Sequence, residues 1–260
     1  MENKPKITIV KIGGNIIDNE QLLSDFLNDF SELKEAKILI HGGGKTATEI
    51  AEKLNLKPLF LNGRRITDKA MLDVTVMTYS GLLNKQIVAQ LQALNTNAIG
   101  FSGADGNAIL SKKRKNSEVD FGFVGDVISV NKELISMLLL QNITPVFSAN
   151  THDGNGQLLN TNADTIASEI AISLSKTFDV NLIYCFEKKG VLLNSEDEES
   201  VIDEIDSEKY IALKEQKIIH SGMLPKLENC FKSLSNGVQN ILIGNQNVLK
   251  NSTIHTKIKL

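Results

Sequence analysis

The most constraining feature of this sequence is the regular alternation of short apolar segments with longer segments of helical periodicity. In the helical segments, apolar residues recur three and four positions apart, and each apolar segment ends at glycine or a polar residue. The apolar segments are residues 7–12, 37–40, 97–101, 143–148, 181–186 and 240–244. The helical segments are residues 21–33, 45–54, 70–94, 132–141, 163–174 and 224–235. This order predicts an α/β fold with a mostly parallel central sheet.

Two stretches interrupt the alternation, and an acidic run marks a third break. Glycine turns lie between β-branched and aromatic residues in two stretches, 58–67 and 108–130. This pattern predicts hairpins at the edge of the main sheet. Residues 195–200 (SEDEES) are expected to form a solvated loop near a boundary between two lobes. A chain of 260 residues is long enough for one large domain of this kind.

Charge and hydropathy exclude several classes of partner. The net charge is only −3, so no general attraction to nucleic acid or to an anionic membrane is expected. The basic run 112–115 (KKRK) is interpreted as a solvated turn. No apolar stretch approaches the roughly 18 residues of a membrane span, and the N-terminal residues lack the apolar region of a signal peptide. A cytoplasmic location is therefore expected.

The cysteines and histidines show no spacing that is typical of a metal site. Cys185 lies in an apolar run and Cys230 in a predicted helix, so we expect both to be buried, reduced thiols. The histidines are dispersed at His41, His152, His220 and His255. We therefore expect no metal ion held by protein ligands.

Three predicted strands end in glycine-rich turns, which is the first indication of a ligand site. The turns are residues 11–14 (KIGG), 41–44 (HGGG) and 102–106 (SGADG). Carboxyl ends of parallel strands lie at one edge of the sheet, where ligands bind in open α/β folds. The second turn is not a phosphate-binding P-loop, because that pattern requires a glycine where Leu39 stands. Its glycines instead let the backbone approach an anion at a helix N-terminus.

Two charged residues occupy positions where local structure alone does not explain them. Lys11 shares a strand face with Ile7 and Ile9, and a lysine is rarely buried without a partner. The alternative is a lysine that extends to solvent at the strand end. Asp164 follows Asn162, the expected N-cap of a helix, so it either complements the helix dipole or orients a nearby ammonium group. Lys11 is its candidate partner.

Three further polar residues allow either a surface role or a ligand role. Lys226 follows Pro225 in the first turn of a predicted helix, where the dipole disfavours a cation unless an anion lies close. Arg65 follows a glycine turn and can clamp a carboxylate, although an ordinary surface arginine has the same local pattern. Asn160 is not needed as a helix cap.

Eight short motifs, in order over nearly the whole chain, resemble those of the amino acid kinase family. They are KIGG (11–14), HGGG (41–44), NGRR (62–65), GLLNK (81–85), SGADG (102–106), FVGD (123–126), NTNAD (160–164) and GMLPK (222–226). Within the family, the chain is similar to the members that phosphorylate the side-chain carboxylate of N-acetyl-L-glutamate, early in arginine biosynthesis.

This resemblance implies a three-layer αβα sandwich around the sheet. Residues 1–175 would form an acyl-amino-acid-binding lobe and residues 176–260 a nucleotide-binding lobe of one continuous domain. The implied reaction is phosphoryl transfer to a carboxyl group, with ATP as donor and Mg²⁺ carried mainly by the nucleotide phosphates. A homodimer is also implied. Arginine-inhibited members carry an extra N-terminal helix, and the six residues before the first strand are too few for one, so we expect no inhibition by arginine.

The resemblance also implies a role for each candidate residue. Lys11 and Lys226 would flank the transferred phosphoryl group, and Asp164 would hold the two lysines in place. Backbone amides of Gly14 and Gly43 would bind the phosphoryl oxygens. The residues implied in acceptor binding are Gly43, Gly44, Arg65 and Asn160. The residues implied in nucleotide binding are Gly13, Glu187, Lys188, Gly190, Ile219 and His220.

The residues before Asn160 leave the acyl group of the acceptor open. Leu159 stands where the family commonly has a tyrosine, and Thr161 is a further substitution in this segment. Within residues 149–151, Asn150 and Thr151 could bond a second carboxylate. N-succinyl-L-glutamate is therefore a second candidate acceptor. Two further hypotheses are a kinase of carbamate or a nucleoside monophosphate on the same fold, and a non-catalytic sensor of nucleotide or amino acid. Loss of either lysine or of the aspartate would favour the sensor, and all three are present.

Overall fold

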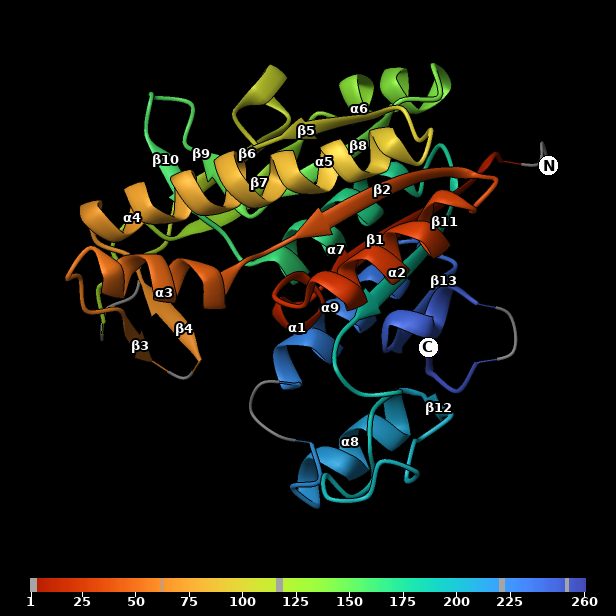
Figure 1. Cartoon of the computed structure of the whole chain (residues 1–260). Helices are drawn as coiled ribbons and strands as arrows, with labels where there is room; N and C mark the ends of the chain where they lie inside the picture. Colours follow the sequence, from red (N-terminus) through yellow and green to blue (C-terminus); the bar gives the residue numbers. More distant parts are fainter. Residues whose placement is uncertain (1–3, 62, 116–118, 220–222, 251–252) are drawn as a thin grey trace.

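The protein folds into three layers, with a central sheet between two layers of helices (Figure 1). The structure is a computed structural model that describes residues 4–61, 63–115, 119–219, 223–250 and 253–260. Helices α2 (Glu20–Ser31) and α5 (Asn84–Ala93) pack together on one face of the sheet. On the other face, α7 (Ala163–Leu174) packs against both α6 (Lys132–Leu140) and α9 (Leu224–Ser235). The predicted α/β sandwich is confirmed.

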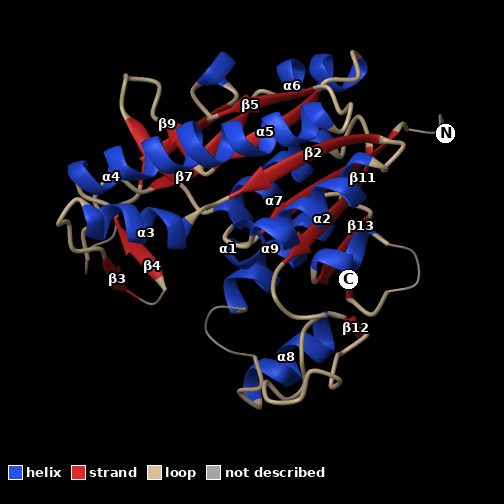
Figure 2. Cartoon of the chain, viewed as in Figure 1, coloured by secondary structure: helices blue, strands red, loops and turns tan. Residues whose placement is uncertain are grey.

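The six predicted strands and the predicted helices all occur, as Figure 2 shows by colour. The strands are β1 (Lys6–Ile12), β2 (Ala36–His41), β3 (Leu59–Leu61), β4 (Arg64–Ile66), β5 (Ala98–Phe101), β6 (Ile109–Lys113), β7 (Gly125–Val130), β8 (Thr144–Ser148), β9 (Asn150–His152), β10 (Leu158–Asn160), β11 (Asp179–Cys185), β12 (Glu204–Ile205), β13 (Asn240–Gly244) and β14 (Thr256–Ile258). The remaining helices are α1 (Gly14–Ile17), α3 (Gly44–Lys53), α4 (Lys69–Thr75), the π-helix η1 (Val76–Leu83), the 3₁₀ turns η2 (Asp105–Asn107) and η3 (Gln246–Leu249), and α8 (Ser207–Glu215). No helix in the described ranges is both long enough and apolar enough to cross a membrane.

The main sheet has the strand order β12-β14-β13-β11-β1-β2-β8-β5. All pairs from β13 to β5 are parallel, and β14 runs antiparallel to β13. The central strands β1 and β11 read as apolar runs because helices cover both of their faces. The carboxyl ends of the parallel strands therefore lie at one edge of the sheet, as predicted.

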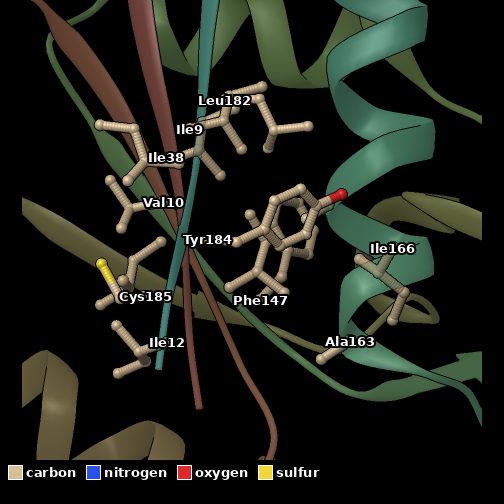
Figure 3. Close-up of a cluster of buried hydrophobic side chains, with 14 of the residues drawn as sticks. Ile9, Val10, Ile12, Ile38, Phe147, Ala163, Ile166, Leu182, Tyr184 and Cys185 are labelled. Atoms are coloured by element: carbon tan, nitrogen blue, oxygen red, sulfur yellow. The ribbon is translucent and has the colours of Figure 1, made fainter. Parts of the chain in front are cut away.

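The core lies between the sheet and its helices. In β1, Ile7, Ile9 and Val10 are fully buried, and each such side chain stabilises the fold by about 1.5 to 3 kcal/mol. On the α7 side, the ring of Tyr184 reaches from β11 toward the helix, with Phe147 beside it (Figure 3). This packing fixes the position of the N-terminus of α7 relative to the end of β1.

The two predicted hairpins exist, but the prediction that they extend the main sheet is wrong. β3 and β4 form a separate two-stranded sheet, and β6 and β7 join β9 and β10 in a four-stranded sheet. The short strands β9 and β10 follow β8 directly, and β9 supplies the hydrogen-bonding edge that β6 uses. The acidic residues 195–199 are exposed in a loop, as expected.

The segment predicted as one helix over residues 70–94 is interrupted by a π-helix. Residues Val76–Leu83 adopt the wider π conformation between α4 and α5. A π segment inside a helix is rare and frequently marks a functional site. Sequence analysis also missed α1, α8, β12 and β14, which are short or carry little apolar periodicity.

Candidate active site

A cavity of about 420 Å³ opens where β2 ends and where α3, α7 and α9 begin. The predicted site residues that line it are Gly43, Gly44, Arg65, Asn160, Asp164 and Lys226. Most of these residues are far apart in the sequence, and the parallel sheet brings them together at its carboxyl edge. The third glycine turn does not reach this cavity. A side chain at Gly103 would lie 2.7 Å from the Ile109 carbonyl oxygen, so that glycine serves close packing instead.

Asp164 joins the two predicted lysines in one ion-pair cluster. Its Oδ1 lies 2.8 Å from Lys11 Nζ, and its Oδ2 lies 2.9 Å from Lys226 Nζ. Lys11 comes from the end of β1 and Lys226 from the first turn of α9. The predicted pairing of Lys11 with Asp164 is confirmed, and Lys226 is neither exposed nor isolated, since it is 8% exposed overall.

The electrostatics of this cluster are set by one carboxylate between two ammonium groups in a buried place. Burial by itself raises the pKa of Asp164, but the charges of Lys11 and Lys226 outweigh it and hold that pKa well below its usual range. Burial lowers the pKa of Lys11, while the carboxylate of Asp164 opposes this change. A single aspartate between two lysines leaves a net positive charge at the cavity wall, which suits an anionic ligand.

Aromatic rings and the helix start fix the position of Lys226. Pro225 stands in the first turn of α9, where its missing N–H costs little. The Lys226 ammonium lies 5.0 Å from the centre of the Tyr184 ring and 6.0 Å from that of Phe186, distances typical of cation–π contact. The Tyr184 hydroxyl donates to the Asp164 carbonyl oxygen at 3.2 Å, so the same ring also fixes the start of α7.

The glycine turns at the ends of β1 and β2 lead directly into helices, and Gly43 is required by close packing. Gly43 has a φ of +146°, and a Cβ atom there would lie 2.3 Å from Leu83 Cδ1. Gly44 begins α3, and no side chain among the described residues caps that helix. Gly14 begins α1 at the end of β1. Backbone N–H groups at such helix starts are available to an anion.

Arg65 is buried, in contrast to the ordinary surface arginine that its local pattern permits. Its Nη2 donates to the Gly44 carbonyl oxygen at 2.7 Å and to Thr48 Oγ1 at 2.8 Å, and its guanidinium lies 4.6 Å from the centre of the Phe60 ring. Asn160 is half-buried and donates from Nδ2 to Thr67 Oγ1 at 3.0 Å. Both side chains are thus held rigidly at the cavity.

Comparisons with known proteins agree with this geometry. A sequence profile described as "Amino acid kinase family" matches residues 6–245. The chain belongs to the amino acid kinase family. Two curated proteins named acetylglutamate kinase are both 51% identical to it. The one from Cytophaga hutchinsonii is matched over 97% of this chain and 98% of its own length, and the one from Parabacteroides distasonis over 92% and 93%.

Solved structures share the fold of this amino acid kinase. The crystal structure of smu.665 from Streptococcus mutans UA159 superposes with a TM-score of 0.81 at 26% identity, covering 97% of this chain and 98% of that one. An N-acetylglutamate synthase from Neisseria gonorrhoeae superposes with a TM-score of 0.83 at 17% identity, covering 98% of this chain and 59% of that one. The second likeness concerns the fold alone.

Five of the six residues predicted to bind the nucleotide of this amino acid kinase are described by the structure, and these five do not line the cavity. Glu187 is exposed, and Lys188 pairs with Glu198 at 2.7 Å. Gly190 packs so closely that a Cβ there would lie 2.6 Å from Thr256 Oγ1. The Gly13 amide donates to the Cys185 carbonyl oxygen at 3.0 Å. Ile219 is buried, and His220 lies outside the described residues. Their role in nucleotide binding stays a prediction.

Sequence analysis missed Arg114, Arg64 and Tyr79, which also line the cavity of this amino acid kinase. Arg114 belongs to the run interpreted as a solvated turn. That interpretation is wrong for this residue, and Lys112 and Lys113 lie in strand β6 rather than in a turn. It is half-buried and pairs with Asp126 at 2.5 Å. Asp126 ends the FVGD motif, which is the one local signal that Arg114 has a partner. Burial of Tyr79 raises the pKa of its hydroxyl.

The residues proposed to bind a second substrate carboxylate are not available to it. Asn150 donates from Nδ2 to Thr75 Oγ1 and accepts from Ser80 Oγ at 2.8 Å. The hydroxyl groups of Thr151 and Thr161 lie 2.7 Å apart and share one hydrogen bond. Leu159 is fully buried and is not part of the cavity wall. Asn150 and Thr151 therefore give no support for a succinyl group, whereas Ala149 and Thr161 of the same segment do line the cavity. The acyl group stays a prediction.

Proposed function

We propose that this amino acid kinase transfers the γ-phosphoryl group of ATP to the side-chain carboxylate of N-acetyl-L-glutamate. The product is an acyl phosphate, formed at an early step of arginine biosynthesis. The observation that carries the proposal is the cluster of Lys11, Asp164 and Lys226 beside a cavity that an acyl-glutamate can enter. The 51% identical relatives that are named acetylglutamate kinase support the same assignment.

The reaction needs charge stabilisation more than acid–base chemistry. A side-chain carboxylate has a pKa near ~4.3 and is already ionised at neutral pH, so no general base is required. A carboxylate oxygen forms a bond to the γ-phosphorus while the bond from that phosphorus to the β,γ-bridging oxygen breaks, and ADP leaves. Lys11 and Lys226 offset the negative charge on the transferred group, and amides of Gly14 and Gly43 bind its oxygens.

Asp164 acts as a positioning residue for the two lysines. Both of its oxygens are engaged by ammonium groups, at 2.8 Å and 2.9 Å. Lys11 and Lys226 repel each other, and the carboxylate between them offsets this repulsion and opposes the lowering of the Lys11 pKa by burial. The presence of all three residues argues against a non-catalytic sensor.

The acceptor is held at the opposite wall of the cavity. We assign its α-carboxylate to Arg65 and Asn160, and its acyl end to Gly43 and Gly44. Arg65 suits this role because its guanidinium is already ordered by two acceptors and by the Phe60 ring. Pre-ordering lowers the entropy lost when the carboxylate binds.

We assign Mg²⁺ to the phosphates of ATP. Among the described residues, no group of three His, Cys, Asp or Glu side chains could hold a metal ion. Asp164 has both oxygens engaged by lysines, so it has little capacity left for a cation. When bound, Mg²⁺ supplies further charge neutralisation on the phosphate oxygens.

The nucleotide is assigned to the second lobe. In this proposal residues 1–175 bind the acyl-amino acid and residues 176–260 bind ATP within one continuous domain. Gly13, Glu187, Lys188, Gly190, Ile219 and His220 are the proposed nucleotide contacts. Lys188 now pairs with Glu198, so it would exchange that exposed partner for the nucleotide. Because ATP is a cytoplasmic donor, we also assign the protein to the cytoplasm.

A hydroxylamine trap for acyl phosphate tests the reaction and the acceptor together. With ATP and Mg²⁺, we expect product from N-acetyl-L-glutamate and a kcat/KM about tenfold or more above that for N-succinyl-L-glutamate. The reason is that Asn150 and Thr151 are satisfied internally and Arg114 already has Asp126 as its partner. L-Glutamate and a reaction without acceptor serve as controls. A preference for the succinyl compound would show that N-succinyl-L-glutamate is the acceptor. The absence of product with every acceptor would favour the non-catalytic sensor.

We propose that the protein is a homodimer that uses the β5 edge of the main sheet. β5 is the last strand at that end, and its Ile99 is 42% exposed. The adjoining π-helix exposes Met77 and Leu82, and it continues into α5, which packs on β5. An unpaired edge strand with apolar neighbours favours pairing with a second copy.

Sedimentation velocity should therefore give a species of twice the 28.5 kDa chain mass. The variant Ile99→Asp should shift that species toward the monomer, because a charge would be buried in the interface. Leu54→Asp changes an apolar residue at the C-cap of α3 that is 53% exposed, and it should leave the dimer intact. A wild-type monomer at micromolar concentration contradicts the proposal.

A further inference from the structure

His41 is a fully buried histidine that the reaction described above does not use. It is the last residue of β2 and the first of the HGGG motif. Its Nδ1 lies 2.9 Å from the Gly42 carbonyl oxygen, and its Nε2 lies 3.0 Å from Asn84 Nδ2. Both ring nitrogens therefore have a partner, one in the glycine turn and one in the first residue of α5.

The hydrogen bonds determine which nitrogen of His41 carries the proton. Asn84 Nδ2 lies 2.9 Å from the Val146 carbonyl oxygen, so it has two acceptors for its two hydrogens. Nε2 of His41 must then accept, and Nδ1 donates to the Gly42 carbonyl oxygen. Burial lowers the pKa of His41 to about 4, so the ring is neutral near pH 7 and keeps this arrangement.

The bond from His41 fixes a peptide plane at the cavity. In a planar trans peptide, the C=O of Gly42 and the N–H of Gly43 point in opposite directions. The imidazole draws the Gly42 oxygen toward the interior, so the Gly43 N–H is directed away from it. Gly43 lines the cavity. Without this hydrogen bond, the consecutive glycines would leave the turn free to adopt many backbone conformations, because glycine is the least restricted residue.

The position of Asn84 is itself built into the fold. It follows the π-helix Val76–Leu83 directly, and the wide π turn decides which way the first side chain of α5 points. The Asn84 side chain packs against Gly100 of β5, where any larger residue would clash, since a Cβ there would lie 1.9 Å from Asn84 Oδ1. Asn84 belongs to the GLLNK motif, for which the reaction gives no other role.

We propose that His41 and Asn84 are positioning residues that hold the Gly42–Gly43 peptide so that the Gly43 amide faces the transferred phosphoryl group. This inference rests on the proposed kinase reaction. Neither residue touches substrate, and both act through the peptide. The rare π turn thereby connects α5 to the geometry of the reacting group.

The test compares three variants with the wild type in the acyl phosphate assay. His41→Leu removes both hydrogen bonds, and we expect kcat to fall about 100-fold, the cost of misplacing a catalytic group by about 1 Å. The KM values for ATP and for the acceptor should stay within about threefold, because the amide acts on the transition state. His41→Asn places an amide N–H near the Nδ1 position and should restore most of kcat. Asn84→Leu leaves Nε2 without a donor and should lower kcat about tenfold.

The matched control is Leu39→Ala, on the same strand and the same strand face as His41. It should lower the melting temperature without lowering kcat, which separates loss of core packing from loss of peptide orientation. A folded His41→Leu or Asn84→Leu protein with wild-type kcat, or a change in KM alone, overturns the inference. If His41→Leu does not fold, His41→Asn and Asn84→Leu decide in the same way. Absence of product from the wild type counts against the proposed function, whereas a wild-type rate in these variants counts only against the positioning role.

Discussion

Replacing Lys226 or Lys11 with methionine should lower kcat for acyl phosphate formation by about 100- to 1,000-fold, while KM for the acceptor changes little. Each ammonium group stabilises charge that develops on the transferred phosphoryl group, and removing one such donor costs about 2.7 to 4 kcal/mol of transition-state stabilisation. Methionine retains most of the side-chain volume, so the effect reports the lost charge. Steady-state kinetics with the hydroxylamine trap measures it.

The controls are lysines of the same elements that lie away from the cavity. Lys232 is on α9, its side chain is 54% exposed, and it pairs with Glu169, while Lys6 begins β1 and is exposed. Lys232→Met and Lys6→Met should keep kcat near the wild-type value, since surface pairs contribute little. A near-normal kcat in Lys226→Met or Lys11→Met removes that lysine from the mechanism.

The variant Asp164→Asn should lose both activity and stability. The substitution leaves two largely buried ammonium groups without a counter-charge, and breaking a buried ion pair from one side costs about 3 to 5 kcal/mol. Urea denaturation at pH 7 measures the free energy of unfolding. Asp73→Asn removes the exposed partner of Lys69 instead and should cost less than about 1 kcal/mol.

The stability lost in Asp164→Asn should also depend on pH, and the direction of this dependence follows from the pKa of Asp164. The pKa of Asp164 is depressed in the folded protein, so its stabilising effect is complete above the unfolded value of about 3.9. That effect is lost as pH falls below this value toward the folded pKa. The difference in unfolding free energy between wild type and Asp164→Asn should therefore be constant from pH 5 to 7 and shrink in more acidic solution. A difference that grows on acidification contradicts the assigned pairing.

Local patterns in the sequence determine much of the fold. Helices α7 and α9 begin and end at the predicted residues, because Asn162 caps α7 and Pro225 stands in the first turn of α9. The central strands are predicted correctly from their apolar runs, because the pattern that identifies a strand lies within a few neighbouring residues. Lys11, Asp164 and Lys226 are predictable because each is anomalous in its own local setting.

Only the tertiary structure decides which distant residues share a surface. Three contacts join segments that are not related by the periodicity of one helix or strand. They are the burial of Arg65, the pairing of Arg114 with Asp126 and the hydrogen bond between His41 and Asn84. The sheet formed by β6, β7, β9 and β10 depends on which strand edges are free after the main sheet has formed. Tyr79 and Leu83 of the π-helix lie against Gly43, a contact between distant segments that no local pattern indicates. Propensity and periodicity act over a few residues, whereas these contacts depend on packing between elements that the chain brings together only when it folds.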